Sequence, residues 1–324
     1  MANGIVLRQH GEPDTLVAED IDVGAPGPGE LRIRQTAVGV NFHDIYVRSG
    51  LYKTLALPGI PGVEAAGIVE EVGDVVSGVS VGDRVGYVTG SYGAYASERR
   101  LPAELAIKLP DGVDELTAAA SLLKGLTVDM LIRRVHHLKS GDTILVHAAA
   151  GGVGRLLCQW ASHIGVHVIG TVGSEKKAAV ARAAGCKHVI LYRQEKFVER
   201  VREITLGHGV DIVYDSVGLD TFTGSLESLA MLGHLVNFGQ SSGNPPPVEV
   251  AQLARGSFSL SRPIIFHYLA DRNRYQDMAA NLFAALNDGI LDIKPGPTFA
   301  LSDAAAAHQH LESRQATGPI VMIP

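Results

Sequence analysis

Cysteine and net positive charge are both scarce in this sequence. Only two cysteines, Cys158 and Cys186, occur in 324 residues, too few for a four-cysteine zinc site. So few cysteines are typical of a cytosolic protein whose thiols stay reduced and structural, so no disulfide is expected. The formal net charge is -6 and no run of lysines or arginines stands out, which disfavours nucleic acid as a partner.

Long apolar stretches are missing as well. No apolar run reaches the roughly 20 residues needed to span a bilayer, and the N-terminus lacks the basic start and apolar core of a signal peptide. Hydrophobic residues make up 46% and charged residues 19%, which is ordinary for a well-buried α/β enzyme. We therefore expect a cytoplasmic protein with no membrane partner.

The chain length and a change in sequence pattern near residue 110 predict two domains. Up to about residue 110, short β-type runs are broken by glycine and proline, which is typical of a compact β-rich domain. These runs cover residues 4–7, 31–40, 66–72, 84–88 and 94–97. Helical spacing then appears over 114–123 and 127–138, with Lys124-Gly125 expected to interrupt it.

The second part of the chain alternates strands and helices. Strands are predicted at 143–147, 166–171, 188–191, 210–214 and 234–238, and helices at 153–164, 175–184, 195–205 and 220–231. Such alternation predicts an α/β fold, a doubly wound parallel sheet with helices on both faces. A strand near 258–260 is expected at the sheet edge, where a second copy could extend the sheet into a homodimer. Helices over 272–287 and 302–312, the latter capped by Ser302, and a strand over 319–323 complete the prediction.

A glycine-rich turn joins the first of these strands to its helix. In Thr143-Ile-Leu-Val-His-Ala-Ala-Ala-Gly-Gly-Val-Gly154, Gly151 and Gly154 fill the second and third glycine positions of the dinucleotide fingerprint, and Ala149 stands at the first. Gly151 would let the backbone approach a pyrophosphate, and Gly154 would let the helix pack on the strand. Glycine turns also occur without a ligand, but the order of strand, turn, helix and strand favours a nucleotide site.

The end of the second strand bears on which nucleotide is bound. NAD-binding units usually place an acidic residue there to hold the ribose 2′-hydroxyl. Here the strand ends in Thr171-Val-Gly-Ser174, followed by Glu175-Lys-Lys177. Ser174 and a lysine could bind a 2′-phosphate, which favours NADPH over NADH. Two alternatives stay open: Glu175 could face the ribose, or residues 175–177 could be the solvated first turn of a helix.

Further residues follow the other predicted strands, where ligands of open α/β sheets bind. Tyr192 could stack on adenine or touch a 2′-phosphate, and Phe238-Gly239 could line the nicotinamide. For each residue alone, a core or turn role is at least as reasonable. Their common location favours binding.

Several motifs resemble those of the medium-chain dehydrogenase/reductase superfamily: Val38-Gly-Val-Asn-Phe42, Pro61-Gly-Val-Glu-Ala-Ala-Gly67 and Val81-Gly-Asp-Arg-Val85, followed by a Rossmann unit. Other segments resemble its bacterial NADPH quinone oxidoreductases related to ζ-crystallin, over essentially the whole chain: Asn41-Phe42, Arg48-Ser-Gly-Leu-Tyr52, Lys124-Gly-Leu-Thr127, His147 to Gly154, Tyr214-Asp-Ser-Val-Gly218 and Ser313-Arg314. The resemblance implies a GroES-like catalytic domain over 1–124, completed by 265–324, and a Rossmann NADPH-binding domain over 125–264.

The zinc-dependent branch of that superfamily has a cysteine in the first motif and a histidine in Gly-His-Glu. This chain has Asn41-Phe-His-Asp44 and Gly62-Val-Glu64 at these places, so two expected ligands are absent. His43 with Asp44 or Glu64 would be a poor zinc site, because it lacks a thiolate or a second histidine. No metal is expected, and an alcohol dehydrogenase mechanism would lose its Lewis acid.

The resemblance implies an oxidoreductase that reduces quinones by metal-free hydride transfer from NADPH in a cleft between the domains. The protein would position nicotinamide against substrate and exclude water. Asn41 and Tyr46 are implied as hydrogen-bond donors and Tyr52 at the cleft mouth, although both tyrosines could be ordinary half-buried aromatics. The implied cofactor contacts are Thr127, Gly151, Gly152, Val153, Gly173, Ser174, Lys177, Tyr192, Ser216, Phe238, Ser241, Arg262 and Arg314.

Two other functions stay open. The same metal-free cleft would also serve an NADPH-dependent reductase of activated carbon–carbon double bonds, such as alkenals or other enones. A nucleotide-sensing, structural or RNA-binding protein is the other, against which the acidic net charge and the intact set of cleft residues argue.

Overall fold

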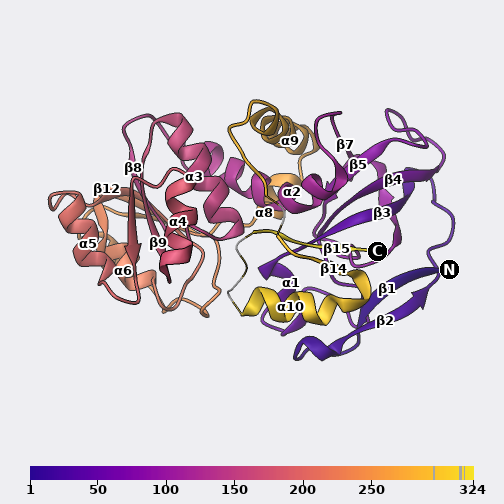
Figure 1. Ribbon diagram of the computed structural model, residues 1–324, viewed down its shortest axis with the longest axis horizontal. Coiled ribbons are helices and arrows are strands. Elements are labelled where there is room, and N and C mark those ends of the chain that lie inside the picture. The colour runs from indigo at the N-terminus through magenta and orange to yellow at the C-terminus, as the bar shows by residue number, and fades with distance from the viewer. Residues whose placement is uncertain (295, 314–315, 317) are drawn as a thin grey trace. The chain divides into compact units, whose positions relative to one another are not determined.

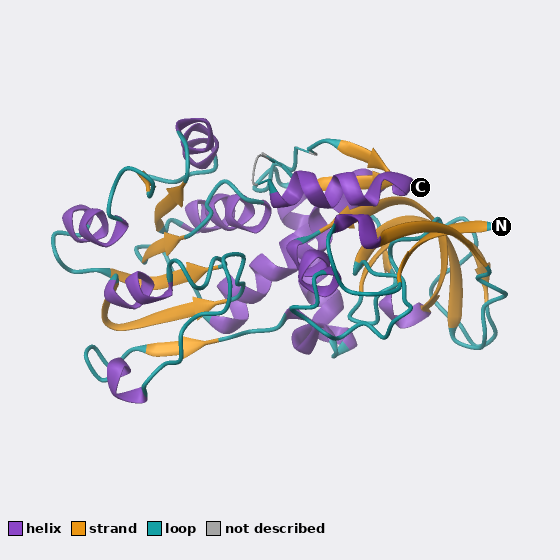
Figure 2. Ribbon diagram, turned by 90° about the horizontal axis from the view of Figure 1, so that it is seen from below, coloured by secondary structure: helices purple, strands orange, loops and turns teal. Residues whose placement is uncertain are grey.

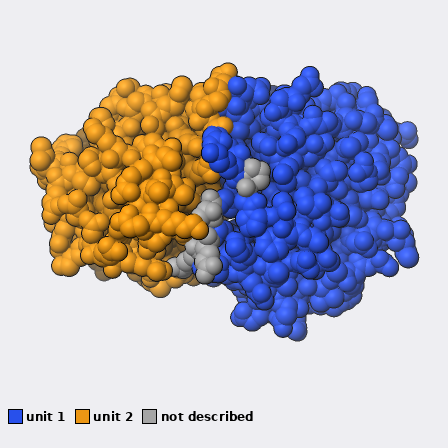
Figure 3. All heavy atoms as spheres, in the orientation of Figure 1, with its two compact units in different colours: residues 1–126, 269–287, 292–324 blue, residues 127–268, 288–291 orange. Residues whose placement is uncertain are grey.

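The computed structural model describes residues 1–294, 296–313, 316 and 318–324. It contains two compact units (Figure 3): unit 1 comprises residues 1–126, 269–287 and 292–324, and unit 2 comprises residues 127–268 and 288–291. Among the described residues, none of the helices has both the length and the apolar character that a membrane crossing requires.

Unit 1 is built on a mostly antiparallel sheet around the long strand β3 (Glu30–Val40) (Figure 1), in which β14 and β15 pair parallel. In β3, Leu31 and Ile33 are buried and alternate with arginines on the other face, the period-two pattern of a half-buried strand. The sheet runs β14-β15-β3-β4-β5-β7, with β6 also paired to β3, and β1 and β2 form a separate hairpin. The other strands of unit 1 are β1 (Ala2–Leu7), β2 (Leu16–Ile21), β4 (Glu64–Val72), β5 (Arg84–Val88), β6 (Glu98–Pro102), β7 (Ile107–Lys108), β14 (Thr298–Ala300) and β15 (Ile320–Ile323).

The α-helices that the described residues of unit 1 form, wholly or mainly, are α1 (Phe42–Arg48), α2 (Glu115–Asp129), α9 (Arg272–Asn287) and α10 (Ala304–Glu312). Short 3-10 turns lie at η1 (Pro13–Thr15), η2 (Ala103–Leu105) and η4 (Leu301–Asp303). Helix α1 follows β3 directly, so the residues at this junction sit at the end of the central strand.

Unit 2 contains the predicted parallel sheet. Its order is β10-β9-β8-β11-β12-β13, and every neighbouring pair is parallel. In chain order this is 3-2-1-4-5-6, the order of a dinucleotide-binding fold. The strands are β8 (Thr143–Val146), β9 (His167–Val172), β10 (His188–Leu191), β11 (Val210–Asp215), β12 (Leu229–Asn237) and β13 (Ser259–Ser261). The predicted edge position of residues 258–260 is confirmed, because β13 ends the sheet.

Helices cover both faces of this sheet (Figure 2). On one face, Leu145 of β8 packs in a cluster with Val201 of α5 and Phe222 of α6. Its neighbours Ile144 and Val146 point to the opposite face and are also fully buried. The helices of unit 2 are α3 (Gly152–Ile164), α4 (Glu175–Ala183), α5 (Phe197–Ile204), α6 (Phe222–Glu227), α7 (Val250–Leu253), most of α8 (Ile265–Leu269), and the π-helix η3 (Met130–Val135).

The expected interruption at Lys124-Gly125 is wrong, because α2 continues through both residues. A Cβ atom at Gly125 would overlap the side chain of Leu282 in α9. Glycine at this position therefore serves the close approach of α9, a tertiary demand that outweighs its low helix propensity.

Three other local expectations are corrected. Residues 94–97 form only an isolated bridge, from Ala96 to Gly4, and the strand is β6 at 98–102. The helix expected over 220–231 ends at Glu227, because Leu229 enters β12 and pairs with Val210; strand pairing here overrides the helix propensity of Leu-Ala-Met. Ser302 lies within η4, and α10 begins at Ala304 without a side-chain cap.

Candidate functional site

The glycine-rich turn lies between β8 and α3, at the carboxyl end of the sheet. Gly151 is the N-cap of α3 and has no side chain to block the helix N-terminus. A Cβ atom at Gly154 would overlap the carbonyl oxygen of Ala148, so only glycine allows α3 to pack this closely on the turn. The implied contacts Gly152 and Val153 form the first turn of α3. The free N–H groups and positive potential of such a helix end suit a pyrophosphate.

Most of the other implied cofactor residues of unit 2 follow the carboxyl ends of successive strands. Gly173 and Ser174 follow β9, Tyr192 follows β10, Ser216 follows β11, Phe238 follows β12 and Arg262 follows β13. Because these strands are parallel, their carboxyl ends share one edge of the sheet. The strand order reverses between β8 and β11, the switch point at which such sheets bind ligands.

The ends of β9 and β10 lie close together. The hydroxyl of Tyr192 would be 2.9 Å from a Cβ atom at Gly173, and Nε of Arg193 would be 3.5 Å from it. Sequence reasoning did not count Arg193 as a cofactor residue, although its place beside Tyr192 was the available signal. No carboxylate stands at the end of β9, so the positive charge of Arg193 next to Gly173 suits a phosphate.

Helix α4 starts at this corner with Ser174 as its N-cap. The Ser174 hydroxyl accepts a hydrogen bond from the backbone N–H of Lys177 at 3.4 Å. Glu175 lies 3.8 Å from Arg182 in an exposed ion pair along the helix. Lys177 is partly buried in the first turn of α4, whereas Lys176 is exposed.

A buried row of hydrogen bonds holds the loops after β8 and β11 together. The hydroxyl of Ser225 donates to Oδ2 of Asp215 at 2.8 Å, so it accepts from Nε2 of His147 at 3.1 Å. Nδ1 of His147 is then the acceptor for the Thr171 hydroxyl at 2.9 Å. This tautomer is neutral, in keeping with burial, which lowers the pKa of His147.

Asp215 also fixes the turn that carries Ser216. Its Oδ1 accepts hydrogen bonds from the backbone N–H groups of Val217 at 2.8 Å and Gly218 at 3.0 Å. The backbone N–H of Ser241 donates to the carbonyl oxygen of Ser216 at 3.2 Å, so the loops after β11 and β12 are joined.

Two implied contacts, Thr127 and Arg262, differ in their surroundings. Thr127 is buried in α2. Arg262 is exposed and donates from Nη1 to the carbonyl oxygen of Asn237 at 3.3 Å, at the end of β12. Arg314 lies outside the described residues.

In unit 1, Asn41 joins the end of β3 to α1 and is almost fully buried. Its Nδ2 donates to Oε1 of Glu64 at 2.8 Å, and its Oδ1 accepts from Nζ of Lys124 at 2.8 Å. Lys124 and Glu64 form an ion pair at 2.9 Å. Sequence reasoning missed both partners as functional residues. The signals were an acidic residue in Gly62-Val-Glu64 and a lysine in the otherwise apolar middle of α2.

The other two implied catalytic residues lie in an aromatic cluster around α1. The rings of Tyr46 and Tyr52 meet edge to face, with centroids 5.1 Å apart, and His43 packs 5.7 Å from Tyr52 and 5.9 Å from Tyr92. Burial lowers the pKa of His43 to about 4, so its ring is neutral at pH 7. Both tyrosines are half-buried. Asn41 precedes α1, Tyr46 lies on it and Tyr52 lies in the loop after it, so one short segment of unit 1 carries all three.

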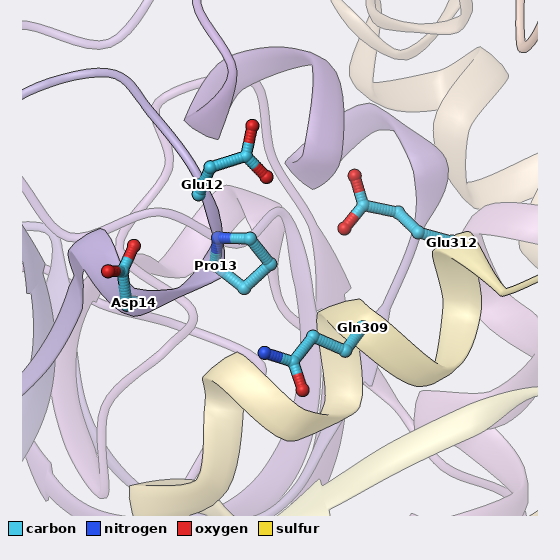
Figure 4. A pocket seen from close by; sticks show the side chains of 5 residues that line it. All are labelled: Glu12, Pro13, Asp14, Gln309 and Glu312. Atoms are coloured by element: carbon cyan, nitrogen blue, oxygen red, sulfur yellow. The ribbon is translucent and has the colours of Figure 1, made fainter.

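A surface pocket of unit 1 lies elsewhere, between η1 and α10. It is lined by Glu12, Pro13, Asp14, Gln309 and Glu312 (Figure 4). It contains none of the implied site residues, and three of its five lining residues are acidic. An anionic nucleotide or the reactive end of a quinone does not match this lining.

Models of two protein families match the chain. The "Alcohol dehydrogenase GroES-like domain" matches residues 27–111, and the "Zinc-binding dehydrogenase" model matches residues 152–284. These regions contain much of the unit 1 sheet and most of the unit 2 sheet, respectively. The predicted GroES-like and Rossmann fold class is confirmed.

Relatives match over their whole length. The chain is 45% identical to a quinone oxidoreductase of Pseudomonas aeruginosa, covering 100% of both, and 44% identical to a 2-haloacrylate reductase of a Burkholderia species, covering 100% of this chain and 99% of the relative. The solved structure of Escherichia coli quinone oxidoreductase complexed with NADPH superposes with a TM-score of 0.96 at 41% identity, covering 99% of this chain and 100% of the other. The chain belongs to the quinone oxidoreductase family of the medium-chain dehydrogenase/reductase superfamily.

Proposed function

We propose that this chain is an NADPH-dependent quinone oxidoreductase. The observation that carries the proposal is the full-length match to quinone oxidoreductases, one of them solved as an NADPH complex. The charge at the ends of β9 and β10 supports it independently, because Lys177 and Arg193 favour a 2′-phosphate and no carboxylate ends β9.

The parts of the chain divide this work. We assign residues 125–264 to the cofactor and residues 1–124 with 265–324 to the substrate. The turn at Gly151 would receive the pyrophosphate, and Ser174, Lys177 and Tyr192 would receive the adenosine end with its 2′-phosphate. Phe238 and Ser241 would lie along the nicotinamide half. NADPH, when bound, supplies the hydride.

The residues around α1 act on the substrate. Asn41 would donate a hydrogen bond to the quinone oxygen on which negative charge develops, and Tyr46 would be a second donor. A donor held in place in a buried setting stabilises such charge more than a mobile one does. Tyr52 would shape the entrance and exclude water.

The proposed reaction uses no metal. Asn41 and Val63 stand where the zinc-dependent branch has ligands. The Glu64 carboxylate is engaged by Asn41, by Lys124 and by the backbone N–H of Leu123 at 2.7 Å. Among the described residues, no group of three or more histidine, cysteine, aspartate or glutamate side chains is arranged to hold a metal ion.

We further propose a cytoplasmic homodimer that pairs through β13. Among the described residues, this strand has a neighbour on one side only, and an exposed strand edge is a template for pairing with another chain. Met231 and Leu232, at the start of neighbouring β12, are 70% and 76% exposed. A partner copy at this edge would cover them.

The test is turnover by the purified protein. NADPH or NADH is added with 1,4-benzoquinone, and the loss of nicotinamide absorbance is followed. We expect rapid oxidation of NADPH and slower oxidation of NADH. No oxidation of either nucleotide beyond the protein-free rate would contradict a quinone reductase.

Reduction of an activated carbon–carbon double bond is the second candidate. It is favoured by the 44% identity to a 2-haloacrylate reductase over the full chain. The same assay with 2-chloroacrylate and with an alkenal separates the two. Turnover of either one far above that of the quinone would reverse the order of the candidates.

A further inference from the structure

The ion pair of Lys124 and Glu64 is buried in unit 1 within a space built for it. Glu64 is fully buried, and the Lys124 side chain is 8% exposed. A Cβ atom at Gly39 of β3 would overlap Oε1 of Glu64 and the carbonyl oxygen of Ala119, so glycine there makes room for the carboxylate. The backbone N–H of Leu123 donates to Oε2 at 2.7 Å. Two separate chain segments, the end of β3 and helix α2, thus accommodate one carboxylate.

Stability alone does not explain this arrangement. Removing two charges from water is costly, and a well-packed apolar pair is often as stable as a buried ion pair or more so. The distinctive product of the pair is the orientation of Asn41. An ammonium group can only donate and a carboxylate can only accept. The Asn41 amide is therefore held with Oδ1 toward Lys124 and Nδ2 toward Glu64.

Within the described part of the chain, this orientation leaves one N–H of Asn41 for a ligand. The amide nitrogen carries two hydrogens, and one is directed at Glu64. The second points away from the carboxylate. If the amide were flipped, Nδ2 would face the ammonium and Oδ1 would face the carboxylate, and both contacts would be repulsive.

We propose that Lys124 and Glu64 are positioning residues, which hold the amide of Asn41 so that its second N–H donates to the carbonyl oxygen of the substrate. The inference rests on the proposed function, because it assigns Asn41 to the reacting carbonyl. Lys124 acts through Asn41, by fixing the orientation of the amide before substrate binds, and Glu64 neutralises its charge.

The test is a cycle of variants. Lys124→Met with Glu64→Gln removes the donor and both charges together, so no unpaired charge stays buried. The pair is made in the native background and in Asn41→Ala, and kcat is measured with NADPH and 1,4-benzoquinone. Lys124→Met alone is measured in both backgrounds as well, so that a folding failure of the double variant leaves a usable cycle.

Controls separate positioning from general damage. Gln35→Met removes another buried polar side chain of unit 1, one that donates to Ala94 O at 3.0 Å. It is expected to lower thermal stability without a comparable loss of kcat. The dissociation constant for NADPH, followed by nicotinamide fluorescence, is expected to stay within about twofold in all variants, because the implied contacts of the nucleotide other than Arg314 lie in unit 2.

The role of Lys124 and Glu64 is measured by the loss of kcat with and without the Asn41 side chain. In the native background, the pair of substitutions is expected to lower kcat by about 10²-fold, the effect of losing a placed donor. In Asn41→Ala it is expected to change kcat by less than about threefold, because residues acting as one unit are not additive. Equal losses of kcat in both backgrounds would overturn the positioning role but not the proposed function. Full activity of the Lys124→Met, Glu64→Gln variant with Asn41 intact would do the same. An inactive wild type would instead overturn the proposed function, and this inference with it.

Discussion

The hydroxyl of Tyr95 donates a hydrogen bond to Oδ2 of Asp44 at 3.1 Å. Behind it, Nε2 of His308 lies 2.8 Å from the same hydroxyl, and Nδ1 of His308 lies 3.4 Å from Nη1 of Arg48. A guanidinium only donates, so Nδ1 accepts and Nε2 carries the proton that it donates to Tyr95. Arg48 is anchored in turn by Glu312 at 2.7 Å. From Arg48 through His308 to Tyr95, each group thus donates one hydrogen bond in the direction of Asp44.

Asp44 is also held by Asn41 of the candidate site. Its Oδ2 accepts from the backbone N–H of Asn41 at 2.9 Å. The row of hydrogen bonds therefore fastens the start of α1, with Asn41, to α10. Substitutions along the row should alter both the stability of unit 1 and the placement of Asn41.

Asp44→Asn should change how stability depends on pH. Burial raises the pKa of Asp44 from 3.8 to about 7, with Glu64 adding to the increase and Lys124 opposing it. Between these values the native protein keeps a proton that the unfolded chain has released. The contribution of Asp44 to the unfolding free energy thus falls as pH rises through this window and is constant above it.

The variant removes this contribution. Relative to wild type, Asp44→Asn is expected to gain stability between about pH 4 and pH 7, by a few kcal/mol at most. Denaturant unfolding of both proteins at several pH values measures the difference. The neighbouring titratable and charged groups, Tyr92, Tyr95, Glu64, Lys124, Arg48 and His308, are the same in both. Parallel stability profiles would show that Asp44 does not titrate in this range.

Lys177→Ala should weaken the binding of NADPH more than the binding of NADH. A charge-assisted bond to a 2′-phosphate contributes about 1.5–3 kcal/mol, so the Michaelis constant for NADPH is expected to rise about tenfold or more while that for NADH changes little. The control is Lys139→Ala, an exposed lysine before the amino end of β8. Equal effects of Lys177→Ala on both cofactors would remove Lys177 from the phosphate site.

Arg193→Ala should show the same preference. Its Nε and the Tyr192 hydroxyl both lie next to Gly173, so it can share the phosphate with Lys177. We expect a selective rise in the dissociation constant for NADPH, measured by fluorescence titration. An unchanged dissociation constant for NADPH would mean that Arg193 does not contact the 2′-phosphate.

Gly39→Ala should disturb the site through Glu64. The new methyl group would occupy the position of Oε1 and meet the carbonyl oxygen of Ala119. Overpacking of this kind costs about 1–3 kcal/mol, so we expect a lower unfolding temperature together with a lower kcat. Gly78→Ala is the comparison for glycine replacement in general, because its surroundings are open, although its backbone is left-handed. A fully active Gly39→Ala protein would mean that Glu64 has room to move.

The proposed dimer has a simple measurement. Light scattering at micromolar concentration should give twice the 34.2 kDa mass of the chain. A mass equal to one chain across a dilution series would rule out pairing through β13.

The sequence by itself determined the fold class, and it grouped the residues that we propose for the cofactor after the predicted strands. Alternation of strand and helix patterns predicted the parallel sheet, since each pattern is a local periodicity. Once the strands are parallel, their carboxyl ends share an edge. Residues such as Ser174, Tyr192 and Ser216 can therefore be grouped from their positions after the predicted strands alone.

Only the tertiary structure decided the partners of the buried polar groups. Lys124 is 60 residues from Glu64 and 83 from Asn41 in sequence, and Tyr95 is 213 residues from His308. Periodicity shows which face of an element is buried, but not which polar group finds a partner there. For the same reason, the local pattern at Lys124-Gly125 predicts a break in a helix that in fact continues. Gly125 makes room for Leu282 of α9, and Lys124 holds Asn41, so the role of each depends on a distant segment.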